Sequence, residues 1–375
     1  MSNKDIKLLK SEFEKLNISS KNNKSNLNRN YGIDLLKIFS MINIINLHIN
    51  INLLYLIPSN PKFKTVYRFE TFSIFAVDAF GIISGIVGYK RYKLVNLIYL
   101  YFEYYFYSVI MQIYYYYKSI ESLKILIHHF FPLGIKRNWF PNAYILMYLF
   151  LPFLTNSINT MDRKLFSKIV IFLIFIYSLY HTVVKFLIGN TQYDFVINGY
   201  SSLWLLILYI IGAYIGRFEK NKKIRFYPLF FLIYLLDSFL SSELFFYIVK
   251  KYKLPYKFFL DYCFPNIMIQ ALSLIFFFSN LKISNKYLIK IILFLNPLNF
   301  NICLIHSKIL FTKTPMILKF NKYIKSMTPK FLFFKLYVIS IMVYVICAFI
   351  DYFRFLLFKI FRIRNLSIYI EKKIL

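Results

Sequence analysis

The chain has 375 residues, of which 59% are apolar or aromatic and only 17% are charged. Its mean hydropathy of +0.54 is far above that of a soluble domain of similar length, so water is not the solvent for most of its surface. The net charge of +31 does not indicate a nucleic-acid partner, because the basic residues fall in short segments between apolar runs, where an anionic membrane surface explains them.

The apolar residues gather in segments long enough to cross a lipid bilayer. A hydrocarbon core of about 30 Å needs about 20 helical residues, and about ten segments meet this length. They are 33–57, 70–89, 94–117, 139–157, 166–188, 199–216, 226–249, 260–279, 288–311 and 331–357. The sequence therefore predicts an all-α, polytopic integral membrane protein with one transmembrane domain over residues 33–358.

Polar tails flank this domain. Residues 1–32 are rich in Lys and Asn, contain no apolar stretch that could act as a cleavable signal, and are expected to be disordered. Lys and Arg are more frequent on the side that holds this tail, so both termini, including the basic tail 359–375, are expected in the cytoplasm. The final Lys372 and Lys373 resemble a dilysine retrieval signal, but chance or a membrane-surface anchor explains them better.

The first span carries three ionisable residues, which are costly inside a membrane and need a reason. Asp34 and Lys37 are one helical turn apart and can form a pair. His48 follows Lys37 by about three turns, so both side chains point to one face, about 16 Å apart along the axis. The structural alternative is that Asp34 and Lys37 mark the cytoplasmic end of the helix, while His48 is a buried, hydrogen-bonded histidine.

The second span places a carboxylate at a depth comparable with that of His48. Asp78 lies in the run 75–85, which ends in Ser84 and Gly85. The span then closes at the cytoplasmic face with the basic segment 90–93. A histidine with a carboxylate partner is the usual arrangement of a general base.

These motifs resemble those of the acyltransferase family 3 membrane proteins, which include O-acetyltransferases of bacterial polysaccharides, lipopolysaccharide O-antigen and related glycans. The family's first-span pattern is an Asp, a basic residue and, after ten intervening positions, a His; the matching residues here are Asp34, Lys37 and His48. Its second-span pattern is Val-Asp followed by apolar residues and Ser-Gly; the matching residues are Val77, Asp78, Ser84 and Gly85.

The resemblance continues to about residue 311. The run Trp139–Tyr144, with Pro152, resembles the family's fourth span, and Trp204–Tyr214 resembles its sixth. Asn296–His306 resembles a late motif in which Phe-x-x-Tyr-Leu-Ile-His is usual; here Cys303 stands in place of the Tyr.

A second departure lies after the second span, where the family often has Arg-x-x-Arg and this chain has Lys90 and Lys93 around Arg91. Lysine keeps the charge but loses the bidentate grip on phosphate.

The resemblance implies transfer of an acyl group, most often acetyl from acetyl-CoA in the cytoplasm, to a hydroxyl of a carbohydrate or lipid-linked glycan on the other side. His48 would be the general base and Asp78 the residue that orients it. The phosphates of the donor would pair with Lys37, Lys90, Arg91 and Lys93. For the 90–93 segment, anchoring at the membrane surface is the alternative.

The acceptor would be bound by Ser84, Trp139 and His306, although His306 could instead support His48 or form a structural hydrogen bond. Glu103 in the third span is a further buried acid. It could serve in helix packing, pair with Lys37 or take part in catalysis.

Several other polar residues carry weaker signals, and no metal site is predicted from them. His128, His129 and His181 lie near loop edges and do not form a cluster of metal ligands. Asp237, Glu243 and Gln270 could line the same intramembrane cavity as His48 and Asp78. Cys263, Cys303 and Cys347 lack the spacing of a disulfide or zinc site. The rival function is a transporter or flippase, which intramembrane charges also mark, but no pair of broken, repeated helices supports it.

Overall fold

The computed structural model describes residues 29–54, 62–117, 133, 139–189, 196–219, 224–254, 258–310, 326 and 328–374. Within these ranges the chain is helical and contains no strand. The N-terminal tail up to residue 28, His128, His129 and Leu375 lie outside the described residues, so the expected disorder of the tail stays a prediction.

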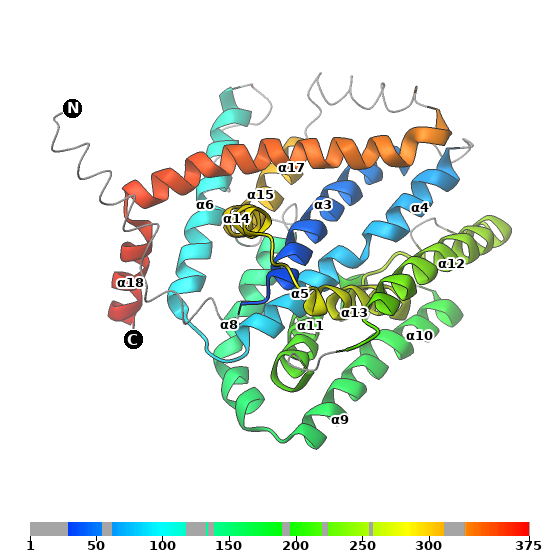
Figure 1. The fold of residues 1–375 in the computed structure, drawn as a ribbon, viewed down its shortest axis with the longest axis horizontal. Coiled ribbons are helices and arrows are strands. Elements are labelled where there is room, and N and C mark those ends of the chain that lie inside the picture. The colour runs from blue at the N-terminus through cyan, green and yellow to red at the C-terminus, as the bar shows by residue number, and fades with distance from the viewer. Residues whose placement is uncertain are drawn as a thin grey trace.

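The helices follow one another along the chain as labelled in Figure 1. In order they are α3 (Tyr31–Leu54), α4 (Phe63–Ser73), α5 (Phe75–Gly88), α6 (Leu94–Tyr117), α8 (Trp139–Thr160), α9 (Arg163–Ile174), η3 (Phe175–Tyr180), α10 (His181–Ile188), η4 (Ile197–Gly199), α11 (Ser202–Tyr214), η5 (Ile215–Glu219), α12 (Pro228–Tyr252), α13 (Pro265–Asn280), α14 (Lys286–Leu295), η6 (Asn296–Leu298), α15 (Asn299–Leu310), α17 (Pro329–Ile360) and α18 (Ile363–Ile374).

Seven continuous helices in the described ranges are long and apolar enough to cross a membrane. They are Tyr31–Asn50, Phe63–Gly88, Arg163–Ile188, Ser202–Glu219, Pro228–Tyr252, Lys286–Ser307 and Phe331–Ile360. The expected count of about ten is not confirmed. The three remaining predicted segments are helices, but α6 is rich in Tyr, α8 ends in a polar stretch, and α13 has only 16 residues.

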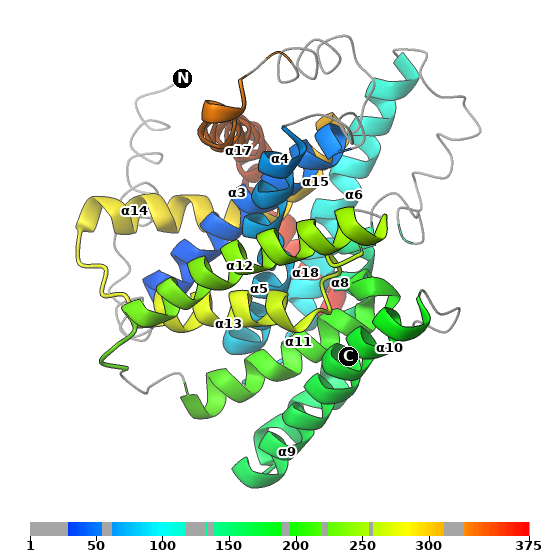
Figure 2. The same ribbon diagram turned by 90° about the vertical axis from the view of Figure 1, so that its right-hand side faces the viewer.

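The spans differ in how much of their surface the protein itself covers. The most apolar stretch of α3, and that of the α4–α5 pair, is 72% buried, whereas the corresponding share is 17% for α9–α10 and 22% for α12. Figures 1 and 2 agree in placing α3 and α5 inside the bundle and α9 at its margin. Apolar side chains on the marginal helices thus face outward, as a lipid environment allows, and the fold is that of an integral membrane protein.

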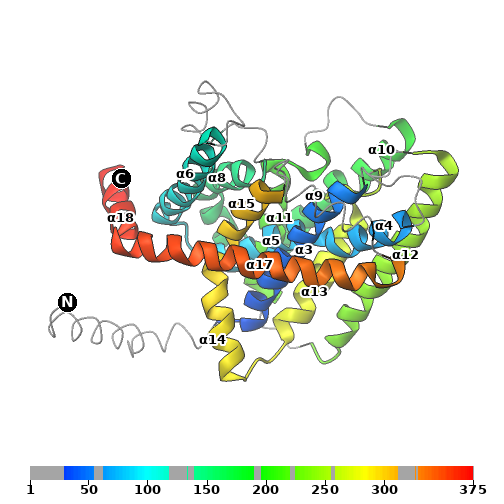
Figure 3. The ribbon, with the colours of Figure 1, turned by 90° about the horizontal axis from the view of Figure 1, so that it is seen from above.

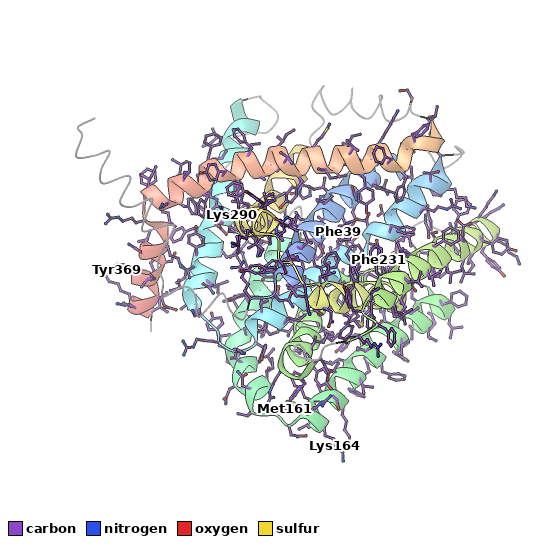
Figure 4. The ribbon with its side chains drawn as sticks, viewed as in Figure 1. Phe39, Met161, Lys164, Phe231, Lys290 and Tyr369 are labelled. Carbon is purple, nitrogen blue, oxygen red and sulfur yellow. The ribbon has the colours of Figure 1, made fainter. Side chains whose placement is uncertain are left out.

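Aromatic stacking joins the inner helices. The ring of Phe39 on α3 stacks on Phe75 of α5 at a centroid distance of 5.8 Å and on Phe278 of α13 at 5.9 Å. Figure 4 labels Phe39 within the bundle, and Lys164 and Tyr369 at its edges. The N-terminal span is therefore the centre of the packing and not a peripheral anchor.

Helices α5 and α11 pack so closely that glycine is required at their contact. A Cβ atom on Gly85 would lie 2.0 Å from the carbonyl oxygen of Tyr209, and one on Gly212 would lie 1.9 Å from the carbonyl oxygen of Ile82. Small residues that let backbones approach are a common basis of helix association in membranes.

We expect Gly212→Ala to destabilise the fold by about 1–3 kcal/mol, because the backbone of α5 must move to admit the methyl group. Thermal unfolding of the purified protein in detergent measures the effect. Gly88→Ala is the matched control, since its Cβ would meet only the end of the Tyr209 side chain, at 3.3 Å. Equal midpoints for the two variants would contradict the assigned packing.

The C-terminal segment, expected as a basic tail, forms helix α18 against α6. Glu371 accepts a hydrogen bond from the backbone nitrogen of Val95 at 3.0 Å, and Arg364 donates to Asn96 at 2.7 Å. Figure 3 shows α17 running along the bundle and α18 turning away from its end, beside α6. Helix α18 is thus fixed next to the start of α6, which directly follows the 90–93 segment.

Candidate active site

Two histidines from distant parts of the chain meet between α3 and α15. The Nδ1 atom of His48 lies 2.8 Å from the Nε2 atom of His306, and the ring centroids are 4.8 Å apart. His306 is fully buried, whereas His48 is half-buried. His48 is therefore the more exposed member of the pair.

The partners of His306 determine which nitrogen of His48 carries its proton. The Nδ1 atom of His306 lies 2.6 Å from the carbonyl oxygen of Ile302, which can only accept, so this nitrogen is the donor. In a neutral ring the Nε2 atom of His306 is then an acceptor, and Nδ1 of His48 donates to it. A neutral His48 held in this way has its lone pair on Nε2, as a general base requires.

Asp78, expected to orient His48, contacts a different residue. Its Oδ1 atom accepts a hydrogen bond from the indole nitrogen of Trp204 at 3.0 Å, and within the described ranges no contact joins it to His48. Asp78 is fully buried, and its Oδ2 atom has no hydrogen-bond partner among the described residues. The reason is geometric: similar depth in the membrane does not fix the direction of a side chain, and this one faces α11.

Buried amides extend along α3 on both sides of the histidine pair. Asn43 accepts a hydrogen bond from the hydroxyl of Tyr337 at 2.8 Å, and Asn50 donates to Glu70 at 3.0 Å. Their spacing with Asn46 follows the helical repeat, and this regular spacing inside an apolar span is a signal that could have identified them from sequence. These amides lie on the side of α3 opposite Lys37 and His48, so the helix carries a second polar face that the three ionisable residues do not indicate.

At the other end of α3, Asp34 has three partners. Arg29 binds its Oδ2 atom at 2.6 Å, Asn296 donates to its Oδ1 atom at 2.5 Å, and the ammonium group of Lys37 lies 3.5 Å from Oδ1. The expected pairing of Asp34 with Lys37 is therefore present. The cluster also attaches the start of α3 to the start of the late motif at Asn296.

The basic segment after α5 lies at the surface. Lys90, Arg91 and Lys93 are exposed, and no contact within the described ranges joins them to Lys37. The carbonyls of Tyr89 and Lys90 accept hydrogen bonds from Asn159 at 3.2 and 3.4 Å, which holds the segment against the end of α8. The structure brings three of the four expected phosphate partners together and leaves Lys37 apart.

The comparison with known protein families gives one match. A family model described as an acyltransferase domain matches residues 30–357 of the chain. The chain belongs to this acyltransferase family. No curated protein and no solved structure matched it. The matched region contains the histidine pair, Asp78 and the 90–93 segment, whereas α18 lies beyond it.

In this acyltransferase the three expected acceptor residues lie in three different places. The hydroxyl of Ser84 donates to the carbonyl oxygen of Phe80 at 2.8 Å and lies 3.2 Å from the hydroxyl of Tyr144. Trp139, at the start of α8, contacts the rings of Tyr200 and Tyr262. His306, the third expected acceptor residue, is turned toward His48 instead.

Other intramembrane polar residues of the acyltransferase pair with one another. Glu103 binds the guanidinium group of Arg354 at 2.8 Å and not Lys37. Asp237 accepts a hydrogen bond from Gln270 at 2.8 Å, which joins α12 to α13. Within the described ranges no three His, Cys, Asp or Glu residues gather as they would around a metal ion.

The orientation of the acyltransferase in the membrane is an expectation that labelling can test. In a variant whose native cysteines are replaced, Lys93→Cys should react with an impermeant maleimide only after the membrane is opened, since the exposed 90–93 segment is expected in the cytoplasm. Tyr252 is exposed at the C-terminal end of α12, which is expected on the outer side of the membrane. A cysteine at this position should therefore react in intact cells. Labelling of Lys93→Cys in intact cells would reverse the assigned orientation.

Proposed function

We propose that this acyltransferase transfers an acetyl group from acetyl-CoA in the cytoplasm to a hydroxyl of a carbohydrate or lipid-linked glycan on the other side of the membrane. The hydroxyl oxygen attacks the thioester carbonyl carbon, a carbon–oxygen bond forms and the carbon–sulfur bond breaks. The proton of the hydroxyl passes to Nε2 of His48 and then to the departing CoA sulfur. The products are an O-acetyl ester and free CoA.

The hydrogen-bonded pair of His48 and His306 is the observation that supports this proposal best. A sugar hydroxyl is a poor nucleophile until a positioned base removes its proton. The contact of His306 with the carbonyl oxygen of Ile302 sets the tautomer, so His48 needs no carboxylate to be held as a base. In this proposal His306 positions the ring of His48, and Asp78 acts only through its hydrogen bond to Trp204.

The positive charge of the 90–93 segment, which is expected on the cytoplasmic side, supports the choice of donor. CoA carries several phosphate charges, and the exposed side chains of Lys90, Arg91 and Lys93 lie on one segment without a carboxylate among them. Lys37 would act deeper in the protein, beside Asp34 and about three helical turns from His48. An acetyl group carried past Lys37 would approach His48 along α3.

Labelled acetyl-CoA tests the proposal directly. The purified protein in lipid nanodiscs is incubated with acetyl-labelled CoA and the glycan and lipid-linked glycan fraction of the host cell. We expect label to enter the glycan fraction and to be released by mild base, since O-acetyl esters are base-labile and N-acetyl groups are not. A transporter or flippase would leave the label on CoA, and this result would reject the proposal.

A further inference from the structure

Three aromatic side chains form a cluster where helices α8, α11 and α13 begin. The ring of Tyr200 lies 4.8 Å from that of Trp139 and 4.8 Å from that of Tyr262, and the rings of Trp139 and Tyr262 stack at 5.9 Å. Tyr200 is 37% exposed, Trp139 is half-buried and Tyr262 is buried. The cluster thus offers an accessible aromatic face on a buried aromatic base.

We propose that this aromatic cluster is the subsite that binds a pyranose ring of the acceptor. The inference rests on the proposed function, which calls for a carbohydrate on the side of the membrane opposite the cytoplasm. In the expected topology the starts of α8, α11 and α13 all face that side. The cluster would hold a sugar ring by its C–H face, since the faces of aromatic rings carry negative charge density that attracts polarised C–H groups.

The backbone next to the cluster is strained in a way that positions Tyr200. Ile197, Asn198 and Gly199 have φ angles of 50°, 55° and 88°, three consecutive residues in the left-handed region. For a β-branched residue such as Ile197 this conformation is a genuine outlier. A Cβ atom on Gly199 would lie 2.5 Å from the Cβ atom of Tyr262, so glycine allows the turn to press against that ring. Strain of this kind concentrates at ligand sites and persists only where surrounding contacts hold it.

A buried lysine supplies those contacts. The ammonium group of Lys185 forms a buried ion pair with Asp261 and donates to Asn198 at 3.1 Å. Asp261 directly precedes Tyr262, and Asn198 lies two residues before Tyr200. One cation therefore fixes the two backbone segments that carry the tyrosines of the cluster.

The charges around the cluster favour a neutral, polar ligand. The charge of Lys185 is neutralised by Asp261, so the ion pair presents no net charge to a ligand. A sugar ring is neutral and has a C–H face that the exposed aromatic ring of Tyr200 can contact.

Ring contacts connect the cluster to the helix of the catalytic pair. Trp139 contacts Phe140 at 5.6 Å, Phe140 contacts Tyr144 at 5.9 Å, and Tyr144 contacts Phe300 of α15 at 6.1 Å. His306 lies on α15, between one and two turns after Phe300. The cluster is therefore joined by a continuous series of packed rings to α15, the helix that carries His306.

Intrinsic fluorescence tests the subsite without any acetyl transfer. The chain has two tryptophans, and Trp204 is fully buried, so a ligand at the cluster reports through Trp139. The purified protein is titrated with the methyl pyranosides of glucose, galactose, mannose and N-acetylglucosamine, and in a separate series with choline. We expect at least one pyranoside, and not choline, to change the emission saturably.

Matched variants show whether the response comes from the cluster. Tyr200→Ala should weaken pyranoside binding by about tenfold, as expected for loss of an aromatic contact, while Tyr200→Phe should retain it. Tyr252→Ala, which removes another exposed tyrosine from the same expected side, should bind as the wild type does. Thermal unfolding in detergent verifies that each variant is folded.

Three results would overturn the subsite: no response of the wild type to any pyranoside, a response to choline alone, or equal weakening by Tyr200→Ala and Tyr252→Ala. Consumption of acetyl-CoA by the same preparations is measured separately. Turnover without pyranoside binding would reject the subsite and keep the proposed function. Pyranoside binding without turnover would keep the subsite and reject the proposed function.

Discussion

We expect His48→Gln to lower the turnover of acetyl transfer by about 10²–10⁴-fold, the usual contribution of general-base catalysis. Glutamine has a similar size and can still bond to His306, but it cannot take a proton from a hydroxyl. Insertion, folding and donor binding should therefore remain close to wild type. Steady-state release of free CoA in nanodiscs, with the glycan fraction saturating, measures the loss.

Two further histidine variants complete this test. His306→Gln removes the group that sets the tautomer of His48, so turnover should fall less than in His48→Gln while the KM for acetyl-CoA stays unchanged. His181→Gln, on α10 and outside the proposed site, should retain full turnover. A properly inserted His48→Gln protein with wild-type transfer would return His48 to a structural role.

From the sequence, support of His48 is one of three possible roles of His306, and nothing in the sequence selects among them. His48 is identified by its place in an apolar span, and His306 by the late motif. Their contact joins residues 258 positions apart, and no periodicity in one sequence relates α3 to α15. The family motifs place both residues in a site, whereas the hydrogen bond that sets the tautomer requires the fold.

Partner assignments fail where only depth in the membrane supports them. Asp78 was expected beside His48 because both lie at comparable depths, yet it is bonded to Trp204. Counting residues along a span gives the height of a side chain but not the neighbouring helix that it faces. The span count differs for another reason: within the described residues seven helices are both long and apolar enough to cross a membrane, and α13, for example, has only 16 residues.

The partner of Glu103 is another contact that depth in the membrane did not predict, and the charged network that contains it should have a large effect on stability. That partner is Arg354, which lies near the end of the last span, where a basic residue is usually a membrane-surface anchor. Arg354 is instead only 2% exposed and binds both oxygens of Asp351, at 2.9 and 2.8 Å. Tyr107 also donates to Asp351, at 2.7 Å, so α6 and α17 are joined by a buried charged network.

Arg354→Leu should lower the free energy of unfolding by about 3–5 kcal/mol, because it leaves the carboxylates of Glu103 and Asp351 buried without their cation. The thermal unfolding midpoint in detergent measures the loss. Adding Glu103→Gln and Asp351→Asn to the same chain should recover most of it, since neutral amides are less costly to bury than unpaired charges. Arg163→Leu, which breaks the exposed pair with Glu219, should change the midpoint little. If Arg354→Leu unfolds at the same temperature as Arg163→Leu, the network does not hold α6 to α17.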